Sequence, residues 1–160
     1  MPQTSDPTLA QLARLVGTWT TEASHPALPG VVVHGTVEAE WLEGERFLIQ
    51  RARTDHADFP DSVSILGFTE RDRVGGAAGS ELASEPRLTM HYFDSRGVFR
   101  VYEVSVEHGG LRFLRNAPGF SQRFSGTFED GDRTLTGRWQ SCEDDVHWAD
   151  DLQITYRRRT

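Results

Sequence analysis

Near the start of the chain, apolar residues recur every three or four positions, at Leu9, Leu12, Leu15 and Val16. This spacing places them on one face of a helix. Asp6 is a suitable N-cap, Pro7 suits the first helical position, and Gly17 follows where helices commonly end. The pattern predicts a short helix over about 7–16 that packs on another element or plugs it.

From Thr18 onward, apolar and polar residues alternate instead, which predicts strands. Ten strands are expected, over about 18–24, 31–42, 46–54, 62–70, 87–94, 98–107, 110–116, 121–129, 132–142 and 150–158. Turn dipeptides such as Arg96-Gly97 and Asp130-Gly131 separate most of them, so that successive strands form an antiparallel meander. Such a meander should close, because an open sheet leaves two unpaired edges. We predict a single all-β domain over 1–160, a ten-stranded up-and-down barrel with its last strand beside its first.

The segment over about 72–86 interrupts this alternation. It is rich in Gly, Ala and Ser, with Val74 and Leu82 as its only larger apolar residues. We interpret it as a flexible loop near the barrel mouth or as a disordered insertion.

Turn lengths decide which face of each strand points inward, because a shift of one residue exchanges the two faces. Two-residue turns at Ser95-Arg96 or Arg96-Gly97, and at His108-Gly109, predict one inward and one outward set. The inward set is Thr89, His91, Phe93, Val98, Arg100, Tyr102, Val104, Val106, Leu111, Phe113 and Arg115. The outward set is Met90, Tyr92, Phe99, Val101, Glu103 and Arg112.

The Asp130-Gly131 turn predicts a cleaner ribbon, apolar on one face and polar on the other. Its inward face holds Phe124, Gly126, Phe128, Leu135, Gly137 and Trp139. The last strand likewise turns Leu152, Ile154 and Tyr156 inward. Trp19, Trp41 and Trp139 are expected in the core or the pocket wall, because tryptophans in strands are usually packing residues.

Charge and cysteine content narrow the function classes. The chain has 24 acidic and 17 basic residues, a formal net charge of −7, so it repels phosphate backbones and nucleic acid is not an expected partner. We interpret the basic run Arg157-Arg158-Arg159 as a solvated strand end. The single cysteine, Cys142, permits no internal disulfide, and neither a signal peptide nor a membrane-length apolar run is visible. These features favour the cytoplasm.

Three parts of the chain resemble the calycin-type small β-barrels, such as lipocalins and fatty-acid-binding proteins, and nitrobindin-like haem-binding barrels in particular. They are Gly17-x-Trp19 after the helix, the ten-strand meander, and the C-terminal sequence Asp151-Leu-Gln-Ile-Thr-Tyr156. The whole is also similar to small bacterial lipocalin-like barrels. The resemblance implies a barrel built around a small-molecule site.

The resemblance also implies a test for haem. In nitrobindin-like proteins a histidine near the start of the last strand binds the haem iron, whereas Asp151 stands at the matching position here. The nearest histidine is His147, and a carboxylate is a poorer ligand for haem iron than imidazole.

The candidate site combines an aromatic wall with a few convergent polar groups, as ligand pockets do. The two arginines of the inward set suit an anionic head group, because a guanidinium cannot lose its charge. We predict that a small hydrophobic or amphipathic ligand with an anionic end binds in the barrel interior. The predicted ligand-binding residues are His91, Arg100, Tyr102, Arg115, Phe113, Phe124, Trp139 and Trp41.

Two alternative functions stay open beside ligand binding. In a haem-binding protein of the nitrobindin type, His147 would be the axial ligand, with His91 as the next candidate. In an isomerase or cyclase, His91 or Glu103 would be the acid/base, and Tyr102 with an arginine would stabilise an oxyanion. No other cofactor, metal site or membrane insertion is expected, and whether the chain forms a homodimer is left open.

Overall fold

The structure is a computed structural model that describes residues 6–70, 86–107 and 109–160. It begins with a short helix, α1 (Pro7–Leu12), and a 3-10 turn over Ala13–Leu15. Ten strands follow: β1 (Gly17–Ser24), β2 (Val33–Trp41), β3 (Phe47–Thr54), β4 (Ser62–Thr69), β5 (Arg87–Asp94), β6 (Phe99–Glu107), β7 (Gly110–Arg115), β8 (Ser121–Glu129), β9 (Thr134–Cys142) and β10 (Ala149–Arg158). Neighbouring strands are antiparallel, and β1 pairs with both β2 and β10, so the barrel is closed. The predicted fold class is confirmed.

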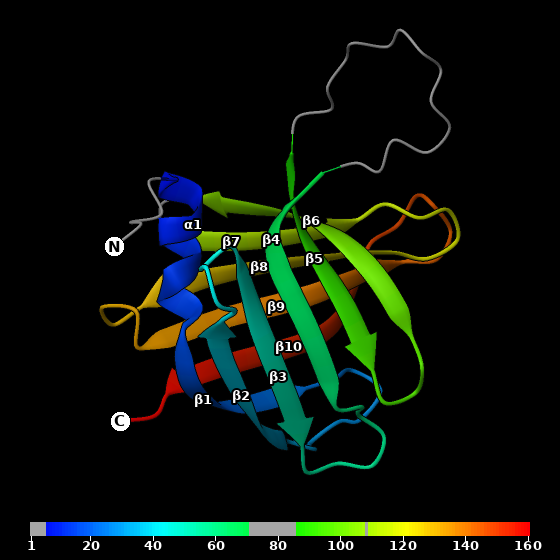
Figure 1. The fold of residues 1–160 in the computed structure, drawn as a ribbon. Helices are drawn as coiled ribbons and strands as arrows, with labels where there is room; N and C mark the ends of the chain where they lie inside the picture. Colours follow the sequence, from blue (N-terminus) through cyan, green and yellow to red (C-terminus); the bar gives the residue numbers. More distant parts are fainter. Residues whose placement is uncertain (1–5, 71–85, 108) are drawn as a thin grey trace, which may run out of the picture.

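The strands form two groups that cross each other. Figure 1 shows β2 to β5 in front, crossing over β7 to β10 behind. β6 turns the corner between the groups, because Phe99–Glu103 pair with β5 while Glu103–Glu107 pair with β7. Glu103 pairs with both strands, and among the described residues Phe99–Tyr102 have no paired residue on the β7 side.

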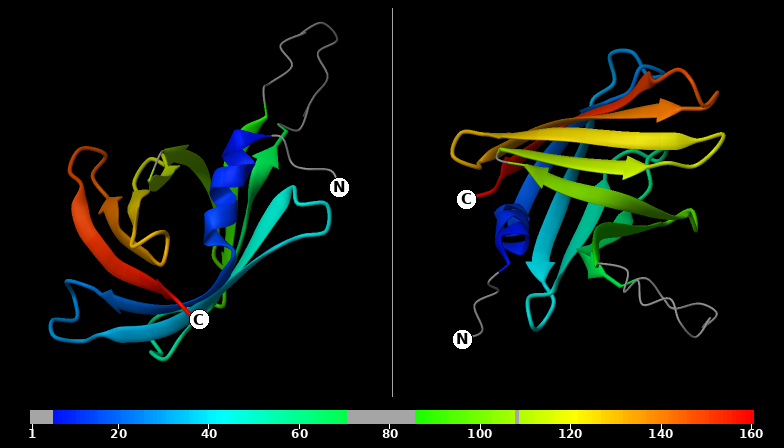
Figure 2. Two further views of the ribbon diagram at one scale, coloured as in Figure 1. Left: turned by 90° about the vertical axis from the view of Figure 1, so that its left-hand side faces the viewer. Right: turned by 90° about the horizontal axis from the view of Figure 1, so that it is seen from above.

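The N-terminal helix closes one end of the barrel. The Asp6 carboxylate accepts a hydrogen bond from the Thr8 N–H at 2.8 Å, which caps α1 as the sequence predicts. Leu9, Leu12 and Leu15 are buried and belong to the hydrophobic core. The left view of Figure 2 shows the helix in front of the opening between the two groups of strands, and the right view shows it at the ends of the strands. We call this the closed end and the opposite one the open end.

Arg158 of β10 fastens the closed end to Trp19 of β1, which lies opposite it in register. The Arg158 guanidinium lies 4.1 Å from the centre of the Trp19 ring and donates hydrogen bonds to the carbonyls of Val16 and Arg14. The Trp19 indole N–H in turn donates to the Leu15 carbonyl at 2.9 Å. Arg158 therefore points into the fold, which corrects the interpretation of its basic run as a solvated strand end.

The turn between β5 and β6 differs from the prediction by one residue. The Asp94 N–H donates to the Val98 carbonyl at 3.1 Å, which leaves a three-residue loop with Gly97 at a φ of 84°. A three-residue hairpin loop commonly ends in such a left-handed residue. Because the register shifts by one, Met90 and Tyr92 share the inward face of Tyr102 and Arg100, to which they pair. The predicted inward residues of β5 lie instead on the outer face: Thr89, His91 and Phe93.

The other two predicted hairpins keep their faces. β6 and β7 pair Val104 with Phe113 and Val106 with Leu111, as predicted, although His108 of this turn lies outside the described residues. β8 and β9 are joined by four residues, 130–133, instead of two. A shift of two residues preserves the faces, so the β8–β9 ribbon is apolar inside, with Phe124 paired to Trp139.

Two expectations concern segments at the limits of the structure. The predicted loop over 72–86 lies outside the described residues, apart from Pro86. Within the described ranges, no helix has the length and apolar character needed to cross a membrane.

Candidate ligand-binding site

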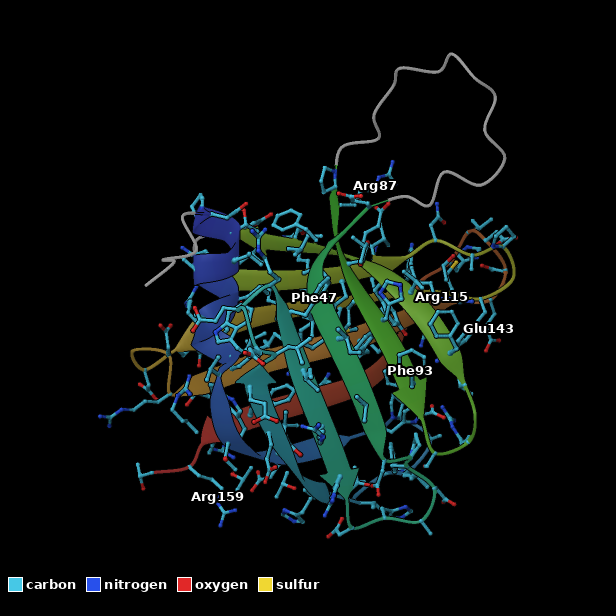
Figure 3. The ribbon with its side chains drawn as sticks, in the orientation of Figure 1. Phe47, Arg87, Phe93, Arg115, Glu143 and Arg159 are labelled. Carbon is cyan, nitrogen blue, oxygen red and sulfur yellow. The ribbon has the colours of Figure 1, made fainter. Side chains whose placement is uncertain are left out.

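At the open end, β6 and β7 separate and leave a groove in the barrel wall. β7 ends at Arg115, and within the described ranges no backbone hydrogen bond continues the pairing to Val101 and Asn116. The groove has a volume of about 560 Å³ and is lined by Phe99, Arg100, Val101, Glu103, Leu114, Arg115, Asn116 and Ala117. Figure 3 shows Arg115 on the side of the molecule away from α1. The groove thus joins an apolar rim, with Phe99 56% exposed, to two arginines.

Both arginines of the groove are positioned by one residue of the β7–β8 loop, Phe120. Arg115 Nη1 donates to the Phe120 carbonyl oxygen at 2.6 Å, and the Arg100 guanidinium lies 5.2 Å from the centre of the Phe120 ring. In the described part of the chain, no carboxylate oxygen lies within 4.0 Å of either guanidinium. Positive charge at this groove is therefore not neutralised by a direct ion pair.

Tyr102 lies behind the two arginines and is only 2% exposed. Its hydroxyl donates to Gln122 Oε1 at 2.9 Å. Burial raises the pKa of Tyr102, the charges of Arg100 and Arg115 act in the opposite direction, and the charge of Asp151 raises the pKa further. The phenol therefore stays neutral at physiological pH, and these charged groups all act on its hydroxyl.

Aromatic side chains form the inner wall next to Tyr102. Phe113, Phe124 and Trp139 stand in register on β7, β8 and β9, with ring centres 5.1 and 5.2 Å apart between neighbours. The Trp139 ring lies 5.5 Å from that of Tyr102. Gly137 makes room for Phe124, because a Cβ at this position would collide with its ring. The aromatic wall expected from the β8–β9 ribbon is present.

A β-bulge turns a carboxylate toward this wall. Asp150 pairs with Gln140 of β9 and Gln153 pairs with Arg138, so Asp151 and Leu152 both stand opposite a single residue, Trp139. Bulges of this kind change the direction of a side chain relative to the regular alternation. The inward position of Asp151 agrees with its effect on the pKa of Tyr102.

His25, at the end of β1, holds the Asp151 carboxylate. Its Nε2 lies 2.6 Å from Asp151 Oδ1, and its Nδ1 accepts a hydrogen bond from the Ala27 N–H at 3.0 Å. Because a backbone N–H can only donate, Nδ1 is the acceptor, so the proton is on Nε2 and is donated to Asp151. The sequence gives no signal for this pair, since 126 positions separate the two residues.

Asp94 fixes the rim of the open end at the β5–β6 turn. Its carboxylate accepts hydrogen bonds from the Tyr92 hydroxyl at 2.8 Å, from the Arg96 side chain at 2.7 Å and from the Arg96 backbone N–H at 2.9 Å. Burial alone would raise the pKa of Asp94, but these hydrogen bonds and one from the Val98 N–H outweigh it and lower the pKa from 3.8 to about 2. Burial and the bond to Asp94 also raise the pKa of Tyr92.

Six of the eight predicted ligand-binding residues come together around the groove and the aromatic wall: Arg100, Tyr102, Phe113, Arg115, Phe124 and Trp139. Trp41 is separate from them, because it ends β2 near the closed end and packs against the core there. His91 is on the outer face, where its ring lies 6.1 Å from that of Phe99.

The residues proposed for acid/base chemistry also lie outside. Glu103 points outward and pairs with Arg87 at 2.9 Å, and His91 shares that outer face. For His91 this corrects the predicted inward placement, whereas Glu103 was predicted on the outer face and lies there. Neither side chain faces the barrel interior, where an isomerase or cyclase would need its acid/base.

The histidines do not fit axial ligation of a haem in the barrel. His147 is 83% exposed, and its Nδ1 lies 2.6 Å from the Asp144 carboxylate. His25 uses both ring nitrogens, as described above for Asp151 and Ala27. Within the described ranges, no histidine directs an unengaged ring nitrogen at the aromatic wall.

Comparison with known proteins supports the fold alone. No protein-family model matches the chain, and no curated protein matches its sequence. Among solved structures, the crystal structure of Rv2717c from M. tuberculosis is similar to it, with a TM-score of 0.63 and 15% sequence identity. The similarity covers 97% of this chain and 99% of that one. At this identity the likeness concerns the fold as a whole.

Proposed function

We propose that the chain binds a small amphipathic carboxylate, with the carboxylate at Arg100 and Arg115 and the apolar part against the apolar side chains that line the groove, Phe99, Val101 and Leu114. The observation that carries the proposal is the meeting of two arginines, without a carboxylate partner in the described part of the chain, at one groove. Arginine is well suited to this role because its planar fork of donors matches a carboxylate. The proposed binding needs no cofactor.

The lining and the size of the groove also support binding of an amphipathic ligand between β6 and β7. Apolar side chains at its rim contribute contact area, while Tyr102 and Gln122 satisfy each other behind it and leave the arginine donors as the polar contacts. The groove volume of about 560 Å³ lies within the range of small-molecule sites, about 300–1,000 Å³. The ligand would lie in the barrel wall between β6 and β7, with its carboxylate beside Arg100 and Arg115.

The test is calorimetric titration with two carboxylates, phenylpropionate and octanoate, and with the corresponding alcohols as uncharged controls. Thermal unfolding is measured with the same compounds, since a ligand that binds only the folded chain raises the melting temperature. We expect the carboxylates to bind at least about tenfold more tightly than the alcohols, because hydrogen bonds to charged groups contribute about 1.5–3 kcal/mol.

Matched variants then locate the site. Arg100→Met should weaken carboxylate binding about tenfold or more. Arg115→Met should do the same and also lower the free energy of unfolding by about 1 kcal/mol, because it leaves the Phe120 carbonyl without its donor. Arg51→Met is the control, since Arg51 lies on the outer face of β3, away from the groove, and pairs with Glu40 of β2. Equal binding by wild type and Arg100→Met, or no stabilisation by any carboxylate, would reject the proposal.

A further inference from the structure

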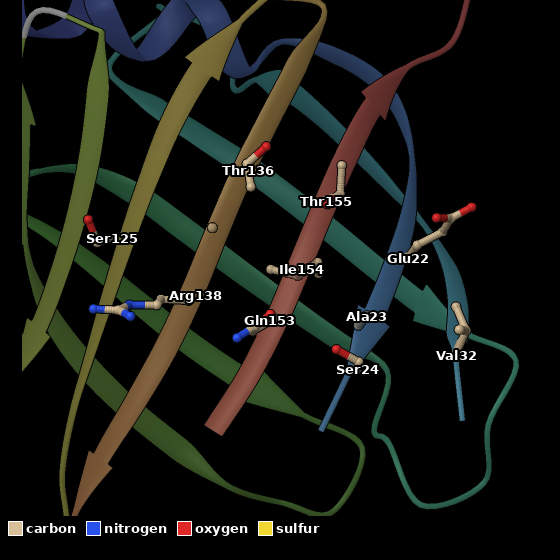
Figure 4. A pocket seen from close by; sticks show the side chains of 11 residues that line it. Glu22, Ala23, Ser24, Val32, Ser125, Thr136, Arg138, Gln153, Ile154 and Thr155 are labelled. Carbon is tan, nitrogen blue, oxygen red and sulfur yellow. The ribbon is translucent and has the colours of Figure 1, made fainter. Parts of the chain in front are cut away.

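A second hollow lies on the outer wall of the barrel, on other strands than the groove of Arg100 and Arg115. It has a volume of about 470 Å³ and extends over β8, β9, β10 and β1. Figure 4 shows the side chains around it, with Arg138 extending from β9 on the same side as Ser125. Seven of its eleven lining residues are polar or charged, Glu22, Ser24, Ser125, Thr136, Arg138, Gln153 and Thr155, and the others are Ala23, Val32, Gly137 and Ile154.

The strand register aligns the polar residues of this wall in one row. Each residue stands directly opposite the next on the neighbouring strand, so all of them share the outer face. We call this set the donor row; it runs Ser105, Arg112, Ser125, Arg138, Gln153 and Ser24 across β6, β7, β8, β9, β10 and β1. Every side chain in it can donate a hydrogen bond, and none carries a negative charge. Four members of the row line the hollow: Ser24, Ser125, Arg138 and Gln153.

The arginines of the donor row differ from three other exposed arginines of the barrel in having no ion pair within the described part of the chain. Arg51, Arg87 and Arg157 each pair with a glutamate on a neighbouring strand, at 3.0, 2.9 and 3.2 Å. In the ranges that the structure describes, no carboxylate oxygen lies within 4.0 Å of Arg112 or Arg138. Arg53 and Arg123, which are also exposed on strands, share this lack of an ion pair among the described residues, so Arg112 and Arg138 are distinguished by their alignment in one row on either side of Ser125.

The nearest carboxylates on the same wall are already engaged or stand further along the strands. Glu22, at the edge of the hollow, pairs with Arg157, and Glu103 pairs with Arg87. Glu107 lies two residues from Ser105 on β6, about 7 Å along the strand, and Glu129 lies four residues from Ser125 on β8, about 13 Å along the strand. The centre of the row therefore keeps two positive charges and several donors directed at solvent.

The spacing of the row fits an oxyanion with several acceptor oxygens. Neighbouring strands lie about 4.8 Å apart, so the backbones of Arg112 and Arg138 are about 10 Å apart with Ser125 between them. Two long arginine side chains from these positions can reach one group above Ser125. A phosphate offers more acceptor oxygens than a carboxylate, and arginine binds it through paired hydrogen bonds.

We propose that the donor row and its hollow form a binding site for a compact phosphate group, carried either by a small soluble ligand or by a lipid headgroup. Arg138 and Arg112 supply the charge, and Ser125 and Gln153 supply further hydrogen bonds. The site is independent of the carboxylate groove, because it lies on the outer face of the neighbouring strands β7, β8, β9, β10 and β1. It uses neither Arg100 nor Arg115.

The test uses two probes that separate the sources of the phosphate. Inorganic pyrophosphate is titrated by calorimetry at low and at moderate salt, and co-sedimentation is measured with phosphatidylcholine vesicles that contain or lack phosphatidic acid. Binding of pyrophosphate alone supports a soluble ligand, and binding that requires phosphatidic acid supports a headgroup. The absence of saturable binding to both probes overturns the proposal.

Variants show whether the donor row is responsible. Arg138→Gln and Arg112→Gln should each weaken binding about tenfold, as expected for one lost charge-assisted contact. Arg51→Gln removes the same charge from an arginine that has its own glutamate and should leave binding unchanged. An equal loss in Arg51→Gln would show that the net charge of the chain decides the binding and would overturn the proposal. All three side chains are exposed, so the melting temperature should stay at the wild-type value.

Discussion

The two ends of the barrel use arginine in opposite ways. At the closed end, Arg158 lies over the Trp19 ring and donates to the backbone carbonyls of Val16, Arg14 and Asp132. At the open end, the Arg100 guanidinium lies over the face of Phe120 and acts on the Tyr102 hydroxyl, and Arg115 uses one nitrogen for a single carbonyl. The guanidinium of Arg158 donates its hydrogen bonds within the fold, whereas those of Arg100 and Arg115 have donors left for a ligand.

The strand pairing also differs between the two ends: it is regular at the closed end and irregular at the open end. At the closed end β1 and β10 remain in register up to Trp19 and Arg158. At the open end β6 loses its β7 partner beyond Glu103, and β10 contains the bulge at Asp151. Irregular pairing costs stability but re-aims side chains. The comparison indicates that the closed end contributes most to stability and that the open end provides the room for recognition.

The largest expected effect is at the closed end, for Arg158→Met. The variant leaves three backbone carbonyls without their donor and removes the contact with Trp19, so we expect unfolding to become easier by about 2–4 kcal/mol. Arg157→Met is the matched control, because it is the next residue of the same strand, points outward and pairs with Glu22 at 3.2 Å. An exposed pair of this kind contributes about 0–1 kcal/mol.

Urea unfolding of both variants measures this difference. If Arg157→Met destabilised the fold as much as Arg158→Met, the assignment of the closed end as the stabilising one would be wrong.

An intermediate effect is expected at the rim of the open end as the pH falls. The pKa of Asp94 is lowered in the folded state from 3.8 to about 2, so its ionised form stabilises the fold at pH values above about 4. This contribution, about 1–2 kcal/mol, should be lost as the pH falls from about 4 to about 2. Urea unfolding of wild type and Asp94→Asn between neutral pH and pH 2 measures it.

The difference between the two proteins isolates Asp94 from other carboxyl groups with lowered pKa values, such as Asp132 and Asp144. The stability gap should be widest near neutral pH and should narrow toward the acid end. A gap that stays constant with pH would contradict the role of the ionised carboxylate.

The smallest expected effect is on ligand affinity, for a substitution of Asp151 in the bulge, and it tests where the ligand carboxylate lies. Asp151 acts on Tyr102 together with Arg100 and Arg115, so its negative charge also opposes a bound carboxylate. Asp151→Asn removes that charge and can still accept the His25 hydrogen bond. We expect binding of phenylpropionate to tighten about threefold, from the loss of one repulsion across a partly solvated site. Calorimetry checks this, and weaker binding would place the ligand elsewhere.

The hairpins show how much of this site the sequence could predict. The β8–β9 loop is two residues longer than its Asp130-Gly131 signal suggests, and the inward face with Phe124 and Trp139 was still predicted correctly. The β5–β6 loop is longer by a single residue, and His91 was therefore assigned to the wrong face. Alternation has a period of two, so only an odd error in loop length exchanges the faces.

Alternation and turn residues are local, so the sequence by itself determined the ten strands, the capped helix, the closed meander and the inward faces of β6 to β9. The partner of each strand is not local, and only the tertiary structure decided three features of the open end. These are the corner at Glu103 where β6 changes partner, the bulge that turns Asp151 inward, and the pairing of Asp151 with His25. The donor row was also decided only by the tertiary structure, because side chains from six strands align only once the barrel has closed and its register is set.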